Sequence, residues 1–202
     1  MKQCVFCKQA AVEKIRELGS EFYKMQTLLE SIDNPNLRYV NPSAYADIFV
    51  ELSKRNAFVG DKRILEVGCG PGYFLYALKR MGINVKGIEL LGMPAKLGQR
   101  NNLDIRIGDA FEISRHFKEK FDFIISRSFF VEGGIFEEFY DGSNKDHLSK
   151  FLFEAREITA EGGIHIHQGF EKITLTEDIS HIGFKPVDEY KGIFGHVVTL
   201  QY

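Results

Sequence analysis

The sequence lacks the features that mark a secreted, membrane-spanning or nucleic-acid-binding protein. Its three cysteines cannot build a disulfide framework, and their odd number fits a reducing compartment. No apolar run reaches the roughly 18 residues that a membrane-spanning helix needs, and the first residues lack the apolar core and cleavage site of a signal peptide. The net charge of −2 indicates neither nucleic acid nor an anionic membrane as a partner. We therefore expect a cytoplasmic protein that binds no membrane and no nucleic acid.

Metal ligands are also scarce. Cys4 and Cys7 form a Cys-x-x-Cys pair, but a structural zinc site needs two further ligands and the sequence has no second cysteine pair. We expect no metal site, and the alternative is a site shared between the subunits of a dimer; the oligomeric state itself is not predicted. The 202 residues, 44% of them hydrophobic, suffice for one sizeable α/β domain and are too few for two.

Residues 64–74 are the most informative part of the chain. Their pattern is typical of a buried strand that runs through a Gly-x-Gly-x-Gly turn into a helix. Gly68, Gly70 and Gly72 let the backbone bend sharply and approach a ligand, and the first N–H groups of the helix point toward the same ligand. Glu66 adds a carboxylate beside the turn, which disfavours a phosphate and favours a ligand with an ammonium group. By themselves, the glycines could mark any tight strand-to-helix turn.

Two known glycine-rich fingerprints do not fit this turn, whereas acids follow at the ends of later predicted strands. The dinucleotide fingerprint fails because Tyr73 occupies the position of its third glycine, and the phosphate loop fails because no Gly-Lys-Ser/Thr follows. Glu89 closes a second predicted strand about 20 residues after the turn, where an acid binds ribose hydroxyls in doubly wound folds. Asp109 and Ala110 follow a third strand, and Ser126 ends a fourth. Each acid alone could simply cap a helix, but together they favour a cofactor site.

The pattern Glu-x-Gly-x-Gly-x-Gly, followed by these strand ends, resembles motif I of the class I S-adenosylmethionine-dependent methyltransferases. The resemblance extends from about residue 63 to the C-terminus and implies S-adenosylmethionine as the cofactor. It also implies that Glu89 binds the ribose, that Asp109 and Ala110 recognise the adenine, and that the fourth strand ends beside the reactive methyl group. The expected cofactor-binding residues are Glu66, Gly68, Cys69, Gly70, Gly72, Glu89, Leu90, Asp109, Ala110 and Ser126.

From residue 63 onward, predicted strands and helices alternate. This order predicts an α/β fold with a doubly wound, mostly parallel sheet and helices on both faces. The last two segments are predicted to pair as a hairpin, and their resemblance to the family's last strands implies a seven-stranded sheet with an antiparallel last strand. The predicted strands are 64–67, 84–90, 103–107, 121–126, 164–168, 184–190 and 196–202. The predicted helices are 73–81, 93–101, 111–117, 146–159 and 175–181.

Two more helices are predicted before the first strand, over residues 9–31 and from about residue 42, because apolar residues recur there at helical spacing. We expect an N-terminal helical extension over residues 1–60, and the resemblance to the methyltransferase family implies that it lies on the substrate side of the cofactor cleft. Residues 61–202 are then the methyltransferase domain. The alternative is that the extension simply covers the sheet.

The acceptor is expected near the ends of the first and fourth strands, because ligands of open α/β sheets bind there. Residues 127–144 form a long connection after the fourth strand, rich in aromatic residues and typical of a lid, although its phenylalanines could also complete the core. An excess of acids between residues 132 and 161 disfavours a nucleic-acid acceptor. The candidate substrate-contacting residues are Tyr39, Tyr45, Arg127 and Phe130.

A histidine is the natural base if the acceptor must lose a proton. His165 and His167 alternate on the predicted fifth strand, and we expect them to point to opposite faces, so that at most one faces the cleft. His167 is the candidate base because it lies nearer the carboxyl end of the strand, and His147 is a third histidine near the site. A structural role is the alternative for each.

The sequence thus predicts an enzyme that transfers a methyl group from S-adenosylmethionine, in an SN2 step, to an oxygen or nitrogen atom of a small-molecule acceptor. Two alternatives stay open. One is a methyltransferase that acts on protein or RNA, and the other is a non-catalytic protein that binds S-adenosylmethionine.

Overall fold

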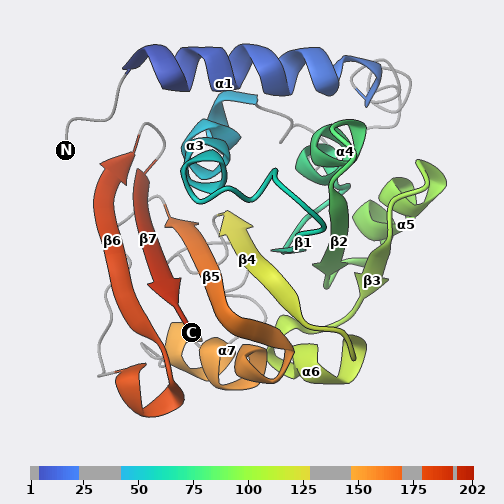
Figure 1. Ribbon diagram of the computed structural model, residues 1–202. Helices are drawn as coiled ribbons and strands as arrows, with labels where there is room; N and C mark the ends of the chain where they lie inside the picture. The colour runs from blue at the N-terminus through green and yellow to red at the C-terminus, as the bar shows by residue number, and fades with distance from the viewer. Residues whose placement is uncertain (1–4, 23–41, 128–146, 170–178, 193–194) are drawn as a thin grey trace.

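A seven-stranded sheet forms the centre of the molecule (Figure 1). The computed structural model describes residues 5–22, 42–127, 147–169, 179–192 and 195–202. The strand order is β3-β2-β1-β4-β5-β7-β6. As predicted for the last strand, β7 runs in the direction opposite to the other six. The strands are β1 (Arg63–Val67), β2 (Asn84–Glu89), β3 (Ile105–Ile107), β4 (Phe121–Arg127), β5 (Thr159–Gly169), β6 (Lys185–Gly192) and β7 (Gly195–Gln201).

Helices cover both faces of the sheet because strand side chains alternate between the faces. On one face, Ile64 of β1 and Ile125 of β4 join a core cluster with residues of α3 and α4. On the other face, Leu65 and Ile124 pack in a second cluster with Phe151 of α7. The helices are α1 (Val5–Leu18), α3 (Ala46–Lys54), α4 (Tyr73–Arg80), α5 (Gly92–Arg100), α6 (Ile113–His116) and α7 (His147–Ala155). The described residues also contain the 3₁₀ turns η2 (Pro42–Tyr45), η3 (Ala110–Glu112), η5 (Arg156–Ile158) and η6 (Ile179–Ile182).

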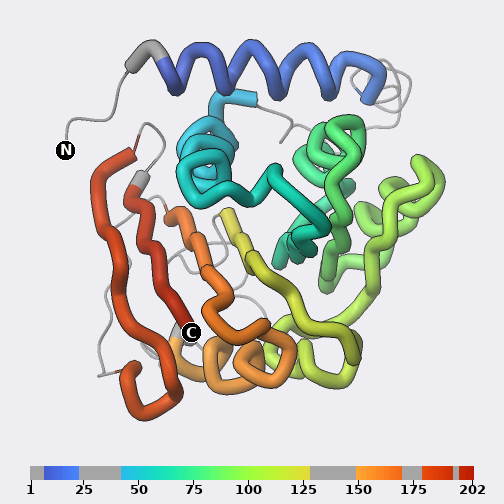
Figure 2. Tube along the Cα trace, in the orientation of Figure 1, coloured from blue at the N-terminus to red at the C-terminus, as the bar shows by residue number. Residues whose placement is uncertain are grey.

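Helix α1 forms an outer layer that lies over α3 and α4 (Figures 1 and 2). At one end, buried Lys8 forms an ion pair with Asp47 at the start of α3. At the other, the hydroxyl of Tyr73 on α4 donates to the carbonyl oxygen of Ile15 at 3.2 Å. Gly19 follows α1 and touches the Tyr73 ring so closely that a Cβ atom there would overlap it. The extension therefore shares one continuous core with the sheet, and its separation from the rest at residue 60 stays a prediction.

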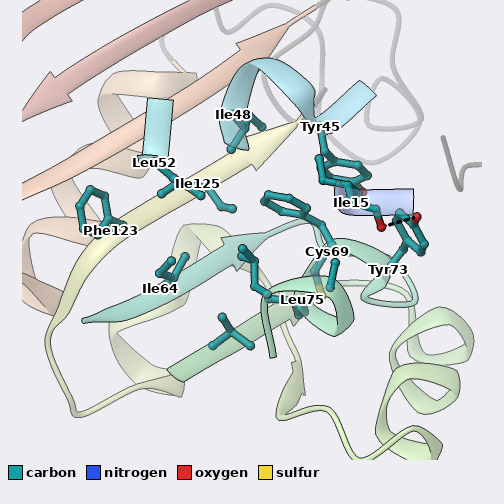
Figure 3. Packing of buried hydrophobic residues seen from close by; sticks show 14 of the residues in the cluster. Ile15, Tyr45, Ile48, Leu52, Ile64, Cys69, Tyr73, Leu75, Phe123 and Ile125 are labelled. Carbon is teal, nitrogen blue, oxygen red and sulfur yellow. Dashed lines mark hydrogen bonds between the residues drawn. The ribbon is translucent and has the colours of Figure 1, made fainter. Parts of the chain in front are cut away.

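Helix α3 places its N-terminus at the carboxyl ends of the strands. Figure 3 shows Tyr45, Ile48 and Leu52 on the same side of this segment, above Phe123 and Ile125 of β4. Tyr45 precedes the helix and packs beside the end of β4, whereas the chain that leaves α3 leads to the start of β1. Tyr45, Ile48 and Leu52 are buried, and Phe49 is half-buried.

The start of β5 departs from the prediction. The strand begins at Thr159 rather than at residue 164, because Thr159 pairs with Phe121 while Ile164 pairs with Phe123. Residues 160–163 bulge out between these two pairs, and Gly162 has a φ of +71°. Gly162 and Gly163, which precede the predicted strand, therefore lie in a bulge within the observed one.

The other predicted elements are present, but some are shorter than predicted and others are split into two. The helix predicted over 111–117 is split into η3 and α6, and the one over 146–159 into α7 and η5. In the predicted helix 175–181, only the turn η6 lies in a described range, and residues 23–31 of the first predicted helix lie outside the described residues. Among the helices of the described ranges, none has the length and apolar character needed to cross a bilayer.

Candidate functional site

The turn between β1 and α4 has the backbone that its glycines predict. Gly68, Gly70 and Gly72 have φ values of +66°, +54° and +79°, a region that favours glycine. A Cβ atom at Gly72 would lie 2.6 Å from the Leu103 side chain, so this glycine is needed for packing. A Cβ atom at Gly70 would meet no heavy atom within 4 Å. The backbone at Gly70 is therefore open to a ligand, whereas the backbone at Gly72 is closed by the core.

Glu89 ties this turn to the end of β2. Its Oε2 accepts a hydrogen bond from the Gly70 N–H at 2.7 Å, and its Oε1 accepts one from the Leu91 N–H at 2.9 Å. A carboxylate offers about four lone-pair sites on its two oxygens. Glu89 can consequently hold the turn in place and still accept hydrogen bonds from the hydroxyl groups of a ligand.

Two exposed apolar side chains flank Glu89. Ile107 lies opposite Glu89 in the register of β2 and β3 and is 42% exposed, and Met93 in the first turn of α5 is 60% exposed. Large apolar groups exposed beside polar ones often mark a ligand surface. The sequence analysis missed both residues, although each stands within four positions of Glu89 or Asp109 along the chain.

Asp109 and Ala110 lie next to this apolar surface. The Asp109 Oδ1 accepts a hydrogen bond from the Phe111 N–H at 2.8 Å, which caps the turn η3. Asp109 is half-buried and Ala110 is buried. The capping role considered for Asp109 from the sequence is therefore present, and it leaves the side chain at the same edge as Glu89.

Glu66 is a buried acid at the end of β1. The side chain is 2% exposed, and its Oε2 accepts no hydrogen bond from any described residue. Burial raises the pKa of Glu66 to about 8, opposed by the positive charge of Arg127 and reinforced by the negative charge of Glu89. A buried acceptor without a donor is costly, so this oxygen is suited to receive a hydrogen-bond donor or a cation from a ligand.

Arg127 and Tyr45 meet at the end of β4. The Arg127 guanidinium carbon lies 4.8 Å from the centre of the Tyr45 ring, which in turn stacks on Phe74 at 4.6 Å with an interplanar angle of 11°. Burial raises the pKa of the Tyr45 hydroxyl to about 12, so the phenol is neutral at physiological pH. The structure thus brings together two of the four residues predicted to contact the substrate.

Gln168 is a further polar residue at this edge that the sequence analysis missed. It pairs with Arg127 in the register of β4 and β5 and is 2% exposed. Neither its Nε2 nor its Oε1 has a hydrogen-bond partner among the described residues. The signal that could have identified it was a polar residue at the carboxyl end of a predicted strand, in the same alternating series as Ile164 and Ile166.

The two β5 histidines lie on the opposite face of the sheet from Glu66 and Arg127. Their ring centres are 5.6 Å apart, and both rings pack near Phe151 of α7. The expectation that His165 and His167 point to opposite faces is wrong, because residues two apart on a strand share a face. Burial lowers the pKa of His167 to about 3 and that of His165 well below its ordinary value, so both are neutral.

Hydrogen bonds hold these histidines within the core. The Ser126 Oγ lies 2.8 Å from the His167 Nδ1, so the Ser126 side chain also faces α7. The Thr159 hydroxyl donates to the Ala155 carbonyl oxygen at 2.8 Å and lies 2.9 Å from the His165 Nε2. Because the single hydroxyl hydrogen of Thr159 is already used, the His165 Nε2 carries its proton and donates to Thr159.

The remaining predicted residues fall into two groups. Cys69 is buried, with its Sγ against Gly87, and Leu90 is half-buried beside Glu89. Tyr39, Phe130, Cys4 and most of the 127–144 connection lie outside the described residues, as does the His147 side chain. Over the described ranges, no three His, Cys, Asp or Glu side chains gather into a group that could hold a metal ion.

The strand order and the residues at the carboxyl edge define a Rossmann-like α/β protein with a glycine turn after its first strand. Residues 37–131 match the family model described as a methyltransferase domain, a range that contains every predicted cofactor-binding residue. The family match and the fold together support an enzyme of the methyltransferase class that uses S-adenosylmethionine as its cofactor.

Several solved structures share the fold. An S-adenosylmethionine-dependent methyltransferase from Clostridium acetobutylicum superposes with a TM-score of 0.60 at 12% identity, over 89% of this chain and 98% of that one. A TehB-like methyltransferase from Corynebacterium glutamicum superposes with a TM-score of 0.53 at 16% identity, over 78% of this chain and 95% of that one. The glycopeptide N-methyltransferase MtfA in complex with S-adenosylmethionine superposes with a TM-score of 0.55 at 12% identity, over 75% of this chain and 91% of that one. No curated protein matches the sequence.

Proposed function

We propose that this protein transfers the methyl group of S-adenosylmethionine to an oxygen or nitrogen atom of a small-molecule acceptor, with the cofactor held along the carboxyl ends of β1, β2 and β3. The observation that carries the proposal is the Glu66 Oε2, which is buried near the end of β1, two residues before the glycine turn begins, with no hydrogen-bond partner among the described residues. The cofactor's ammonium group is the cation that this oxygen lacks. The odd number of cysteines supports the further proposal that the protein resides in the reducing cytoplasm.

Glu66 is the residue proposed to bind the cofactor's amino acid end. Its carboxyl is held largely protonated at neutral pH by burial, which raises its pKa to about 8. An ammonium group within hydrogen-bonding distance would favour the ionised form and satisfy the buried oxygen. Gly68, Cys69, Gly70 and Gly72 would let the backbone pass close to the same part of the ligand.

The nucleoside end is proposed to occupy the surface between Glu89 and Asp109. Glu89 would accept hydrogen bonds from the ribose hydroxyls, with Leu90 beside it. Asp109 and Ala110 would recognise the adenine, and the exposed side chains of Met93 and Ile107 would cover its rings. This assignment gives a physical reason for leaving these two apolar groups uncovered in the free protein.

The acceptor is proposed to lie over the end of β4, against Arg127 and Tyr45. The sulfonium of the cofactor supplies an activated methyl group, so the protein mainly has to align the acceptor atom and exclude water. Tyr39 and Phe130 remain candidates for the same role. The ring of Tyr45, fixed on Phe74, offers a rigid wall against which a small acceptor can be oriented.

We infer that His167 supports the core and is not the general base. Its ring lies on the α7 face, and a pKa of about 3 would make it a poor proton acceptor. The hydrogen bond to Ser126 gives it a structural role, and it gives the Ser126 side chain the same role. The end of β4 would then contribute to the cofactor site through its backbone.

The experiment that tests the function is methyl transfer from S-adenosylmethionine carrying a labelled methyl group. Purified protein would be incubated with three separate acceptor pools: small metabolites, peptides and proteins, and RNA. We expect label only in the small-molecule pool, and we expect Glu66→Gln to abolish most of it. Transfer to the peptide or RNA pool would identify the alternative acceptor classes. Cofactor binding without transfer to any pool would indicate a non-catalytic protein.

A further inference from the structure

We propose that Arg127 and Gln168 together recognise a carboxylate group on the methyl acceptor. This inference rests on the proposed function and adds the chemical class of the acceptor to it. Three observations support it: the adjacency of the two residues in the sheet, the unsatisfied amide of Gln168, and the position of both residues relative to the proposed cofactor site.

Gln168 is placed where a ligand group can complete its hydrogen bonds. The side chain is almost fully buried, yet both ends of its amide lack partners in the described structure. A buried amide in this state is costly unless a ligand or water supplies the missing bonds. The Nε2 offers two donors and the Oε1 one acceptor, so a carboxylate could accept from Nε2 while a neighbouring N–H or O–H of the same molecule donates to Oε1.

Arg127 brings the positive charge that selects an anion. Its guanidinium group is planar and presents its N–H donors in a fork that matches a carboxylate. Contact with the Tyr45 ring fixes the direction of the group, and the register places its strand position directly beside that of Gln168. Adjacent strands lie about 4.8 Å apart, a spacing at which side chains from both strands can contact one small anion.

The position relative to the cofactor site supports the same conclusion. Glu66 is paired with Ile125 on β4, which lies two residues before Arg127 on the same face of the sheet. The proposed amino acid end of the cofactor is therefore on one side of Arg127 and Gln168 is on the other. An acceptor held by these two residues would sit between the guanidinium and the cofactor's sulfonium, where two positive charges favour an anionic molecule.

A buried water molecule is the competing explanation for the Gln168 amide. Thr199 of β7 pairs with Ile166 on the same face, and its buried Oγ1 also lacks a partner among the described residues. A water between Gln168 and Thr199 would need several such polar partners. In that case both side chains would contribute to stability, and neither would affect which acceptor binds.

The test uses full-length protein saturated with S-adenosylhomocysteine. The probes are matched sets of small aliphatic and aromatic compounds, each available as carboxylate, primary amide and methyl ester, with binding followed by ligand-observed NMR. We expect the hits to be carboxylates. We expect Gln168→Met and Arg127→Lys to weaken carboxylate binding by about tenfold or more, since each variant loses hydrogen bonds to a charged group. Thr199→Val is the matched control and should bind the same carboxylates as the wild type.

The outcomes separate this proposal from the one on which it rests. Failure of S-adenosylhomocysteine to bind folded wild-type protein would contradict the proposed function itself. Normal S-adenosylhomocysteine binding with no preference for carboxylates, or with carboxylate binding that Gln168→Met leaves unchanged, would overturn the carboxylate proposal alone. If Gln168→Met and Thr199→Val change thermal stability equally while carboxylate binding stays intact, the buried-water explanation is correct.

Discussion

The two faces of the central sheet carry buried polar groups of contrasting character. On the α7 face, Ser126 and Thr159 make hydrogen bonds to the two β5 histidines, and both imidazoles are neutral. On the α4 face, Glu66 and Gln168 have polar atoms without partners among the described residues. Both sets lie on the central strands β1, β4 and β5 and are almost fully buried. Burial of a polar group, even with one unsatisfied atom such as the His165 Nδ1, therefore does not by itself mark a site. Glu66 and Gln168 are distinguished because they also lie at the carboxyl ends of their strands, on the face that the glycine turn follows.

This contrast also separates stability from function. The polar groups on the α7 face fill the core, and each is held by at least one side-chain hydrogen bond, so their removal should affect folding. The unsatisfied polar groups on the α4 face lower the stability of the free protein, and a bound ligand would offset this loss by completing their hydrogen bonds. Variants can therefore be chosen that change one property and leave the other largely intact.

The largest effect is expected at Gly72. Replacement by alanine places a Cβ atom 2.6 Å from the Leu103 side chain at a φ of +79°. Overpacking and a left-handed backbone together should lower the free energy of unfolding by about 2–5 kcal/mol. Gly70→Ala is the control: it has the same type of backbone but open space around the Cβ atom, so it should cost about 1–2 kcal/mol while still weakening cofactor binding. Chemical denaturation of both variants measures the difference, and equal destabilisation would contradict the distinct roles of the two glycines.

Glu89→Gln should have the next largest effect, on binding. The substitution replaces one acceptor oxygen by an NH₂ group, so either the Gly70 N–H or the Leu91 N–H loses its partner. We expect S-adenosylhomocysteine to bind about 5- to 150-fold more weakly, which corresponds to ~1–3 kcal/mol. Titration calorimetry would measure the dissociation constant of S-adenosylhomocysteine for both proteins. An unchanged dissociation constant in a folded variant would show that the end of β2 does not contact the ligand.

The pH dependence of stability should show the two faces acting in opposite directions. The pKa of Glu66 is about 8 in the folded protein against an ordinary 4.5, so the folded state holds the extra proton and stability falls as pH rises through this interval. The pKa of His167 is about 3 against 6.5, so the unfolded state binds the proton and stability is lost as pH falls from 6.5 toward 3. Each group contributes at most about 1.4 kcal/mol per pH unit.

We therefore expect the free protein to be most stable near neutral pH. In Glu66→Gln the decline on the alkaline side, between about pH 6.5 and 8, should become shallower. The loss of stability on the acid side should become steeper between about pH 6.5 and 4.5, because Glu66 no longer opposes the effect of His167 there. Thermal unfolding over this pH range measures both slopes. An alkaline decline that the substitution does not change would mean that Glu66 is already ionised in the folded protein.

The smallest effect on function is expected for His167→Asn. The asparagine side chain can keep a hydrogen bond to Ser126, and the residue lies on the face remote from the acceptor. Once an acceptor is found, the transfer rate should remain within about twofold of the wild type, whereas loss of a general base lowers rates by about 10²–10⁴. A fall of that size, with S-adenosylhomocysteine affinity unchanged, would restore His167 as the base and contradict the division between the faces.

The parts of the structure that could be predicted from the sequence depend on local chemistry. The glycine turn needs left-handed backbone that few other residues adopt, so its position and the strand and helix around it are visible in the chain. The same holds for Glu89 and Asp109, because each follows a short apolar run that predicts a strand. The seven-stranded, mostly parallel sheet with an antiparallel last strand, which the family resemblance implies, is confirmed.

The parts that could not be predicted depend on pairing between distant residues. The bulge at residues 160–163 follows from the register of β5 on β4, which no local pattern reveals. Gln168 becomes notable only because the fold buries it beside Arg127 without a partner among the described residues. The error for His165 and His167 is of another kind, since the two-residue period of a strand was sufficient to place them on one face.

The most direct measurement is the number of protons released when S-adenosylmethionine binds. At pH 7 the Glu66 carboxyl should be largely protonated in the free protein, since its pKa is about 8, and it should ionise against the ligand's ammonium group. Titration calorimetry in two buffers of different ionisation enthalpy gives the number directly. We predict release of close to one proton per ligand for the wild type, and weaker binding without release for Glu66→Gln. Absence of binding by the folded wild type, or the same proton release from both proteins, would contradict the assignment of Glu66 to the cofactor site.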